Sequence, residues 1–229
     1  MERHFDEQLA ELKTLLIRMS GLAELMIADA LKILVNRDAS AAAAVFQHEE
    51  QVNRLQIEVD EMCLALIATH QPVAGDLRFL LGAVKTNNEL ERLADLAVNV
   101  CEKGCELISH PPVKPFVIIP EMAAIASGMA RDSLHAYVNR DTTLARSVLA
   151  RDDALDERKT RVTNELAEHI RHFPETTTAA LDLILVARNL ERIGDHATNI
   201  AENTIFVVQG KDIRHNVETV GMGRVATKS

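Results

Sequence analysis

The sequence predicts an all-α protein made of two tandem, similar three-helix antiparallel bundles, with six long helices in all. Three observations lead to this prediction. Apolar residues recur at helical spacing over stretches of about 30 residues, prolines interrupt those stretches, and one polar segment occurs twice, at 90–102 and 190–202. No stretch alternates as a β-strand does, and Ala and Leu, which favour helices, dominate the apolar set.

The first bundle is expected to span residues 1–110. Its helices should cover Phe5 to Asn36, about Ala39 to Thr69, and about Val73 to Ser109. The Asn-Arg-Asp turn at 36–38 ends the first helix, and Asp38 or Ser40 caps the second. Pro72 ends the second helix, because proline cannot continue one.

The second bundle is expected to span residues 116–209, after a proline-rich linker at 111–115. Its helices should cover about Ile118 to Asn139, then a stretch that reaches about Arg171, and then about Thr176 to Val208. The Asn-Arg-Asp turn recurs at 139–141, offset by 103 residues from the first. Residues 210–229 are expected to form a polar, flexible tail.

Composition excludes several classes of protein. The net charge of -9 argues against nucleic acid as a partner, because phosphate backbones need a basic surface. The cysteine number, 3, gives no disulfide framework and fits a reducing compartment. The N-terminus is acidic rather than a signal peptide, and no apolar run is long enough for a membrane span. We therefore expect a cytoplasmic protein.

The repeated segment carries the same polar residues at the same spacing in both copies. On a helical wheel, Leu90 and Leu93 fall on the core side, and the polar residues fall on the opposite side. We call these polar sets the first stripe (Glu91, Asp95, Asn99, Glu102) and the second stripe (Glu191, Asp195, Asn199, Glu202). Both stripes are expected on the outer surface of their bundles.

Cation binding is the interpretation we favour for the two stripes. Glu91 and Asp95 are like charges at i, i+4, an arrangement that costs a few tenths of a kcal/mol unless a cation is bound. The side chains offer only oxygen donors, which hard and borderline cations accept. Asp29 and Asp132, on the first helix of each half, are expected to add a carboxylate beside each stripe. The predicted metal ligands are Asp29, Glu91, Asp95, Asn99, Asp132, Glu191, Asp195 and Asn199.

The alternative interpretation is that each stripe is a solvated or protein-binding helix face. Arg92 and Arg192 lie beside the stripes, and a salt bridge at i, i+3 is favoured for them over contact with phosphate or a partner. His196 is favoured as a helix-face residue rather than a metal ligand.

The two segments at 88–95 and 188–202 resemble the doubled E-x-x-x-D signature of the PhoU family. The entry to the third helix, 71–78, and the opening from Phe5 to Met19 are also similar, so the resemblance covers about residues 4–208. It implies two three-helix bundles, often as a homodimer, and iron or zinc clusters at the E-x-x-x-D motifs, with magnesium or manganese as alternatives.

The resemblance also implies a function. Members of the PhoU family regulate phosphate homeostasis and restrain phosphate uptake and the phosphate-starvation response. They couple the high-affinity phosphate ABC transporter to its sensor histidine kinase, and they reach the membrane only through these partners. One departure concerns an aspartate that often follows the acidic position of the second helix: the second copy has Asp153 and Asp156, but the first has Glu50 and Asn53. The entry at 175–178 also lacks the A-x-D-L-R form.

Two other functions compete with this regulatory role. A carboxylate-bridged di-iron enzyme needs E-x-x-H motifs that point into a bundle core, and this sequence contains no E-x-x-H. A metal-binding helical scaffold, with the repeat as simple duplication, is the other alternative. We therefore expect a regulator rather than an enzyme.

Overall fold

The structure is a computed structural model, and it describes residues 2–113, 118–211 and 213. The first half forms α1 (Glu2–Asn36), a 3-10 turn η1 (Ala39–Ala41), α2 (Ala42–His70) and α3 (Ala74–Ile108). The second half forms α4 (Ile118–Asn139), α5 (Thr142–Leu149), α6 (Asp152–His172), a 3-10 turn η2 (Pro174–Thr176) and α7 (Thr177–Gln209). The described part of the chain contains no strand, which confirms the all-α prediction.

One expected helix is divided in two. The fifth helix was predicted as a continuous element, but it is interrupted between α5 and α6 at Ala150 and Arg151. The amide of Arg151 bonds the carbonyl of Val148 at 3.0 Å, a tighter turn than the α-helix allows. The predicted linker is described only at 111–113, and the predicted tail only at Gly210, Lys211 and Ile213; the other residues of both lie outside the described part.

The two Asn-Arg-Asp turns have the same geometry, as the repeat predicts. Arg37 and Arg140 adopt left-handed φ angles of 54° and 55°. The Asp141 carboxylate accepts hydrogen bonds from the amides of Thr143 and Leu144, and the Asp38 carboxylate accepts them from the amide and the hydroxyl of Ser40. Because left-handed backbone is costly for a residue with a Cβ, the caps that follow help to hold each turn in place.

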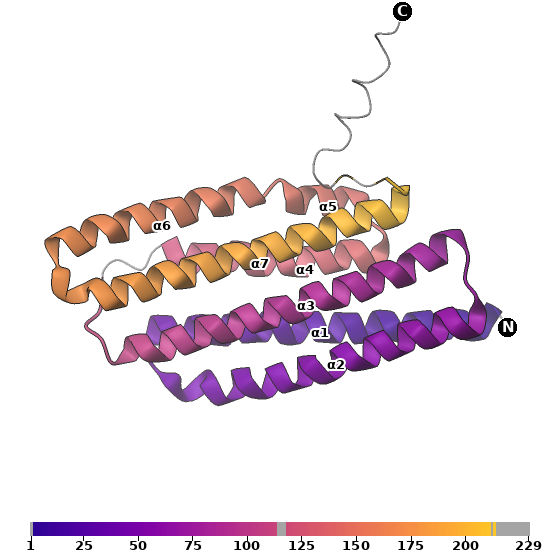
Figure 1. The fold of residues 1–229 in the computed structure, drawn as a ribbon, viewed down its shortest axis with the longest axis horizontal. Coiled ribbons are helices and arrows are strands. Elements are labelled where there is room, and N and C mark those ends of the chain that lie inside the picture. Colours follow the sequence, from indigo (N-terminus) through magenta and orange to yellow (C-terminus); the bar gives the residue numbers. More distant parts are fainter. Residues whose placement is uncertain (1, 114–117, 212, 214–229) are drawn as a thin grey trace, which may run out of the picture.

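The two bundles pack against each other along α3 and α7 (Figure 1). Arg78 donates a hydrogen bond to the carbonyl of Val207 at 3.2 Å, and Lys103 pairs with Asp182 at 3.2 Å, so α3 and α7 run antiparallel. In Figure 1, α1 and α4 lie behind this pair, and α2 and α6 lie at its outer edges. The two halves are therefore related by an approximate two-fold rotation.

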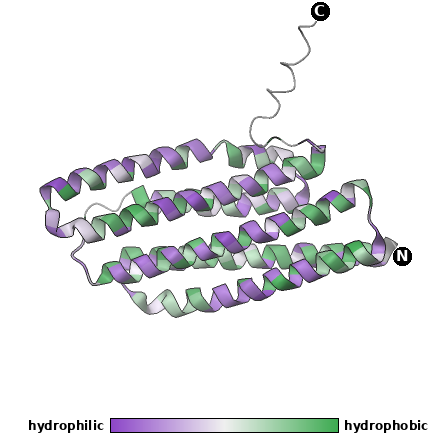
Figure 2. Cartoon of the chain, viewed as in Figure 1, coloured by the Kyte–Doolittle hydropathy of each residue, from purple (hydrophilic) through white to green (hydrophobic). Residues whose placement is uncertain are grey.

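The core is built from Leu, Ile, Val, Met and Ala and runs through both halves. Leu12, Met26, Leu90 and Ile193 are fully buried, and they lie on the faces that the helical spacing assigns to the core. Figure 2 shows hydrophilic residues along most of α6, at the outer edge of the second bundle. None of the described helices combines the length and the hydropathy needed to cross a membrane.

Candidate functional site

The two stripes lie on α3 and α7, the helices that form the junction between the bundles. The first glutamate of each stripe is more covered than the wheel predicts: the Glu91 and Glu191 side chains are 20% and 18% exposed. Asn99, Asp195 and Asn199 are exposed, as expected. The stripes therefore form partly sheltered carboxylate surfaces, rather than fully solvated faces.

A second acidic cluster surrounds the second stripe, where α6 packs beside α7. Its members are Asp152, Asp153, Asp156, Glu191 and Asp195. Burial raises the pKa of the Asp152 carboxyl to about 6, and the neighbouring carboxylates, Asp195 first among them, add to that rise. Asp195 is exposed overall, but partial burial of its carboxyl, and then Glu191, raise its pKa. These carboxylates destabilise one another in the ionised form.

A first acidic cluster occupies the matching place between α2 and α3. It consists of Glu49, Glu50, Glu91, Asp95 and Glu102. Burial raises the pKa of Glu49, and so do Asp95 and Glu102 across the helix boundary. Burial and Asp95 likewise raise the pKa of Glu91. Both halves thus concentrate negative charge at the same position of the fold.

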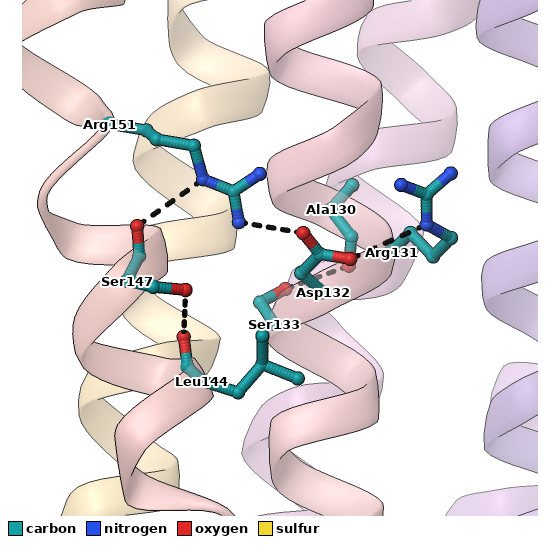
Figure 3. Close-up of polar contacts among 7 residues, drawn as sticks. All are labelled: Ala130, Arg131, Asp132, Ser133, Leu144, Ser147 and Arg151. Atoms are coloured by element: carbon teal, nitrogen blue, oxygen red, sulfur yellow. Dashed lines mark hydrogen bonds and ion pairs between the residues drawn. The ribbon is translucent and has the colours of Figure 1, made fainter.

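Asp29 and Asp132, the residues expected to add a carboxylate beside each stripe, both make ion pairs. Asp132 is held by Arg151 at 2.8 Å and by Arg131 at 3.4 Å, so that it ties α4 to the break between α5 and α6 (Figure 3). Asp29 pairs with Lys32 on its own helix at 2.8 Å. Carboxylates of α2 and α6 approach the stripes as well, since burial and then Asp95 raise the pKa of Glu49, and burial and then Asp195 raise the pKa of Asp152.

Basic residues balance part of each cluster. Arg92 pairs with Glu91 at 3.7 Å and with Asp95 at 3.6 Å, which is the salt bridge expected for it. Lys159 of α6 pairs with Glu191 at 3.1 Å. Sequence reasoning missed Lys159, which the offset of 103 makes equivalent to Gln56 of the first half.

The junction between the stripes has its own hydrogen-bond network. The Glu89 carboxylate of α3 lies 2.6 Å from Nδ1 of His196 and accepts a bond from Asn199 at 3.1 Å. Asn203 donates to the carbonyl of Gly82 at 2.9 Å. His196 is therefore used to join the bundles, and Asn199 points its amide toward Glu89.

The donor chemistry of both clusters fits a hard or borderline cation. Carboxylates gathered at mutual cost are the ligands such ions prefer. In the side-chain conformations of the described residues, no group of three or more His, Cys, Asp or Glu side chains is placed to hold a metal ion. A cation here would draw carboxylates together from two helices. Binding it would relieve the repulsion between these negative charges.

With this geometry in hand, comparison with known proteins is informative. The family model for the PhoU domain matches residues 16–104 and 119–204, one segment in each half. The chain belongs to the PhoU family. A PhoU homolog of the phosphate-specific transport system accessory protein from Caulobacter vibrioides is 36% identical over 212 residues, covering 92% of both chains. A homolog from Aquifex aeolicus is 34% identical, over 91% of this chain and 95% of its own.

Solved PhoU structures share the fold. The crystal structure of PhoU from Pseudomonas aeruginosa aligns with a TM-score of 0.86 and 32% identity, over 90% of this chain and 100% of that one. The phosphate transport system regulatory protein PhoU from Streptococcus pneumoniae aligns with a TM-score of 0.84 over 91% of this chain. At 22% identity, the second likeness supports the fold alone. The all-α architecture of two bundles is thus that of the PhoU family.

Proposed function

We propose that this protein regulates phosphate uptake as an accessory protein of a phosphate-specific transport system. It restrains uptake and the phosphate-starvation response by coupling the high-affinity phosphate ABC transporter to its sensor histidine kinase. It acts in the cytoplasm, as a homodimer, and has no catalytic reaction of its own. Family membership supports the general role, because the curated relatives are named as accessory proteins of that transport system.

The observation that carries this proposal is the duplication of an acidic surface on one face of the molecule. Glu91 and Asp95 on α3, and Glu191 and Asp195 on α7, lie on the two helices that join the bundles. Neither bundle core needs these carboxylates, since the apolar side of each helix already supplies the packing. A surface that both halves keep, at an electrostatic cost, suits recognition of a partner or a cation.

We further propose that each acidic cluster binds metal, with iron or zinc as first candidates and magnesium or manganese as alternatives. The metal would be held by Glu91, Asp95 and Asn99 in one half and by Glu191, Asp195 and Asn199 in the other. Asp29 or Asp132 and carboxylates of α2 and α6 would complete each ligand set. Bound cations would neutralise charge that otherwise opposes close packing of α2 on α3 and of α6 on α7. A partner surface would then meet a cation-bearing face.

A double substitution, Asp95→Ala with Asp195→Ala, tests the regulatory role. The variant should derepress phosphate-starvation genes in phosphate-rich medium, which a reporter fusion measures. Immunoblotting must show the normal protein level, so that derepression is not a consequence of degradation. The matched control is Asp6→Ala with Glu157→Ala, which removes two exposed acidic residues outside the stripes and the acidic clusters. Full repression by the stripe variant at normal level would contradict the proposal.

Elemental analysis of the purified protein tests the metal. Iron, zinc or manganese should co-purify with the wild type, and Asp95→Ala with Asp195→Ala should reduce the metal content. A metal-free protein that stays folded and represses normally would rule out a required metal. The di-iron enzyme is disfavoured, because the clusters lie between the polar edges of helices and not inside a bundle core.

A further inference from the structure

A groove between α6 and α7 is lined by three cationic side chains, although the protein is acidic overall. The groove has a volume of about 490 Å³, and its lining residues are Lys159, Thr163, Ile184, Arg188, Glu191, Arg192 and Asp195. Three cations against two carboxylates leave one net positive charge, within a chain whose net charge is -9. Although other carboxylates of the second acidic cluster lie beside the groove, the three cations of its lining offer hydrogen-bond donors to an anion.

Two of these cations are placed at a cost. Arg188 and Arg192 are like charges at i, i+4 on an exposed helix face, an arrangement that destabilises a helix slightly. Arg188 forms no hydrogen bond or ion pair with any residue that the structure describes. Guanidinium groups present planar, paired donors that match the oxygens of a phosphate. An oxyanion between them would convert repulsion into attraction.

The first half shows what the same place looks like without this function. Gln56 and Asn88 stand where the second half has Lys159 and Arg188, and Gln56 Nε2 donates to Asn88 Oδ1 at 3.4 Å. Asp60 stands in place of Thr163. The first half thus has one cation against three carboxylates at these positions. Its two neutral residues, Gln56 and Asn88, are hydrogen-bonded to each other. In the second half Lys159 pairs with Glu191, and Arg188 has no ion pair with a described residue.

Carboxylates beside the cations specify the kind of anion. At neutral pH inorganic phosphate still carries a proton, whereas sulfate carries none, so only phosphate can donate a hydrogen bond to a carboxylate. Asp195 and Glu191 offer that acceptor on the rim of the groove, and a carboxylate has lone pairs on both oxygens to serve a proton and a cation at once. We propose that the α6–α7 groove binds inorganic phosphate, with Lys159, Arg188 and Arg192 as donors and Asp195 or Glu191 as acceptor.

The meaning of this site rests on the proposed function, because a regulator of phosphate uptake that binds phosphate can report its level directly. The binding itself does not depend on the transporter or the kinase. It is therefore measured on the purified full chain, where failure would leave the regulatory test above unaffected.

Isothermal titration calorimetry with inorganic phosphate, in a buffer with a chelator, is the decisive measurement. The wild type should show one saturable site with a Kd of about 1 mM or tighter. Lys159→Gln with Arg188→Asn gives the second half the residues of the first, and should weaken binding at least about tenfold. The matched control is Arg161→Gln with Arg171→Asn, which removes the same charge from exposed positions of α6 paired with Glu165 and Glu168.

The control should bind like the wild type, and circular dichroism should show all three proteins folded. Sulfate and glycerol 3-phosphate should each bind at least about fivefold more weakly than phosphate, because sulfate has no proton and most of the ester has lost its own at neutral pH. Equal weakening in the control would contradict the proposal, because it would show that the overall charge of the protein, and not the groove, decides phosphate affinity. No binding, equal binding of sulfate, tighter binding of the ester, or binding only with added metal would overturn the proposal.

Discussion

The two bundles carry the same polar motif, but its surroundings differ. In the first half, α2 runs unbroken past the stripe, whereas in the second half the chain breaks between α5 and α6, beside Asp152. Asp152 has its pKa raised to about 6, mainly by burial. Duplication therefore preserved the polar residues of the two stripes, while the neighbouring helices diverged. The two halves serve as internal controls for each other.

Packing under the motif differs as well. Where the first half has Ala94 and Val52, the second has Gly194 and Leu155, a smaller residue with a larger one. A methyl group at Gly194 would lie 2.5 Å from Cδ2 of the buried Leu155. Each half thus packs a different pair of complementary side-chain sizes beneath the same polar motif.

Gly194→Ala gives the largest expected effect on stability. The added methyl meets Leu155 in a filled core, and overpacking costs about 1–3 kcal/mol, offset by up to about 1 kcal/mol of helix propensity. We expect a net loss of about 1–2 kcal/mol in urea unfolding. Adding Leu155→Val, which copies the first half, should recover most of it. An unchanged unfolding midpoint for the single variant would show that Leu155 moves freely.

A swap between the halves gives the next largest effect, on cation affinity. Asp156→Asn makes the second acidic cluster resemble the first, and Asn53→Asp does the reverse. Because affinity for hard cations follows the number of charged ligands, the first change should weaken Mn²⁺ binding to the second cluster about tenfold, and the second should strengthen binding to the first. Calorimetry with Mn²⁺ measures both. If either affinity does not change, or changes in the opposite direction, Asn53 and Asp156 do not take part in cation binding.

A pH-dependent change in stability comes third. An acid whose pKa is higher in the folded state stabilises that state at low pH, and the contribution is lost as pH rises from about 4 through about 6. Asp152→Asn should therefore stabilise the protein by about 1 kcal/mol at pH 7, a value reduced for partial exposure, and by little near pH 4. Urea unfolding at both values measures this.

Asp153→Asn, at an exposed neighbouring position, is the control for this effect. Glu49→Gln makes the corresponding change in the first half, where burial also raises the pKa. An equal gain at pH 4 and pH 7 for Asp152→Asn would contradict the explanation by charge.

Much of the fold follows from the sequence, because local rules decide it. The Asn-Arg-Asp turns and the Pro72 break lie where expected, and the apolar faces of α3 and α7 are buried as the wheel predicts. The break at Ala150 and Arg151 does not follow, since no Gly or Pro marks it. Arg151 reaches Asp132 on another helix at 2.8 Å, and such a tertiary contact leaves no local signal.

The candidate site was predicted only in part, because local periodicity shows the motif residues but not their neighbours on other helices. The motif residues on α3 and α7 share one helix face, which periodicity reveals. Their neighbours Glu49 and Asp152 come from other helices, and the sequence shows no spacing that links them to the motif. Asp29 and Asp132 were expected beside the stripes because each helix of a three-helix bundle neighbours the other two, and the sequence did not show that Lys32 and Arg151 pair with them. These contacts depend on how neighbouring helices are aligned along their length, which sequence patterns do not specify.

The smallest effect on stability, and the sharpest comparison, concerns the two equivalent arginines. Arg92 is 62% exposed and makes only long ion pairs, so Arg92→Gln should change the free energy of unfolding by less than about 0.5 kcal/mol. Arg192→Gln, at an exposed position, should change it as little. Phosphate binding should nevertheless weaken in the Arg192 variant alone, because only the second half has Lys159 and Arg188 beside that arginine. Equal phosphate affinity in the two variants would mean that the cations of the second half do not form a phosphate-binding site.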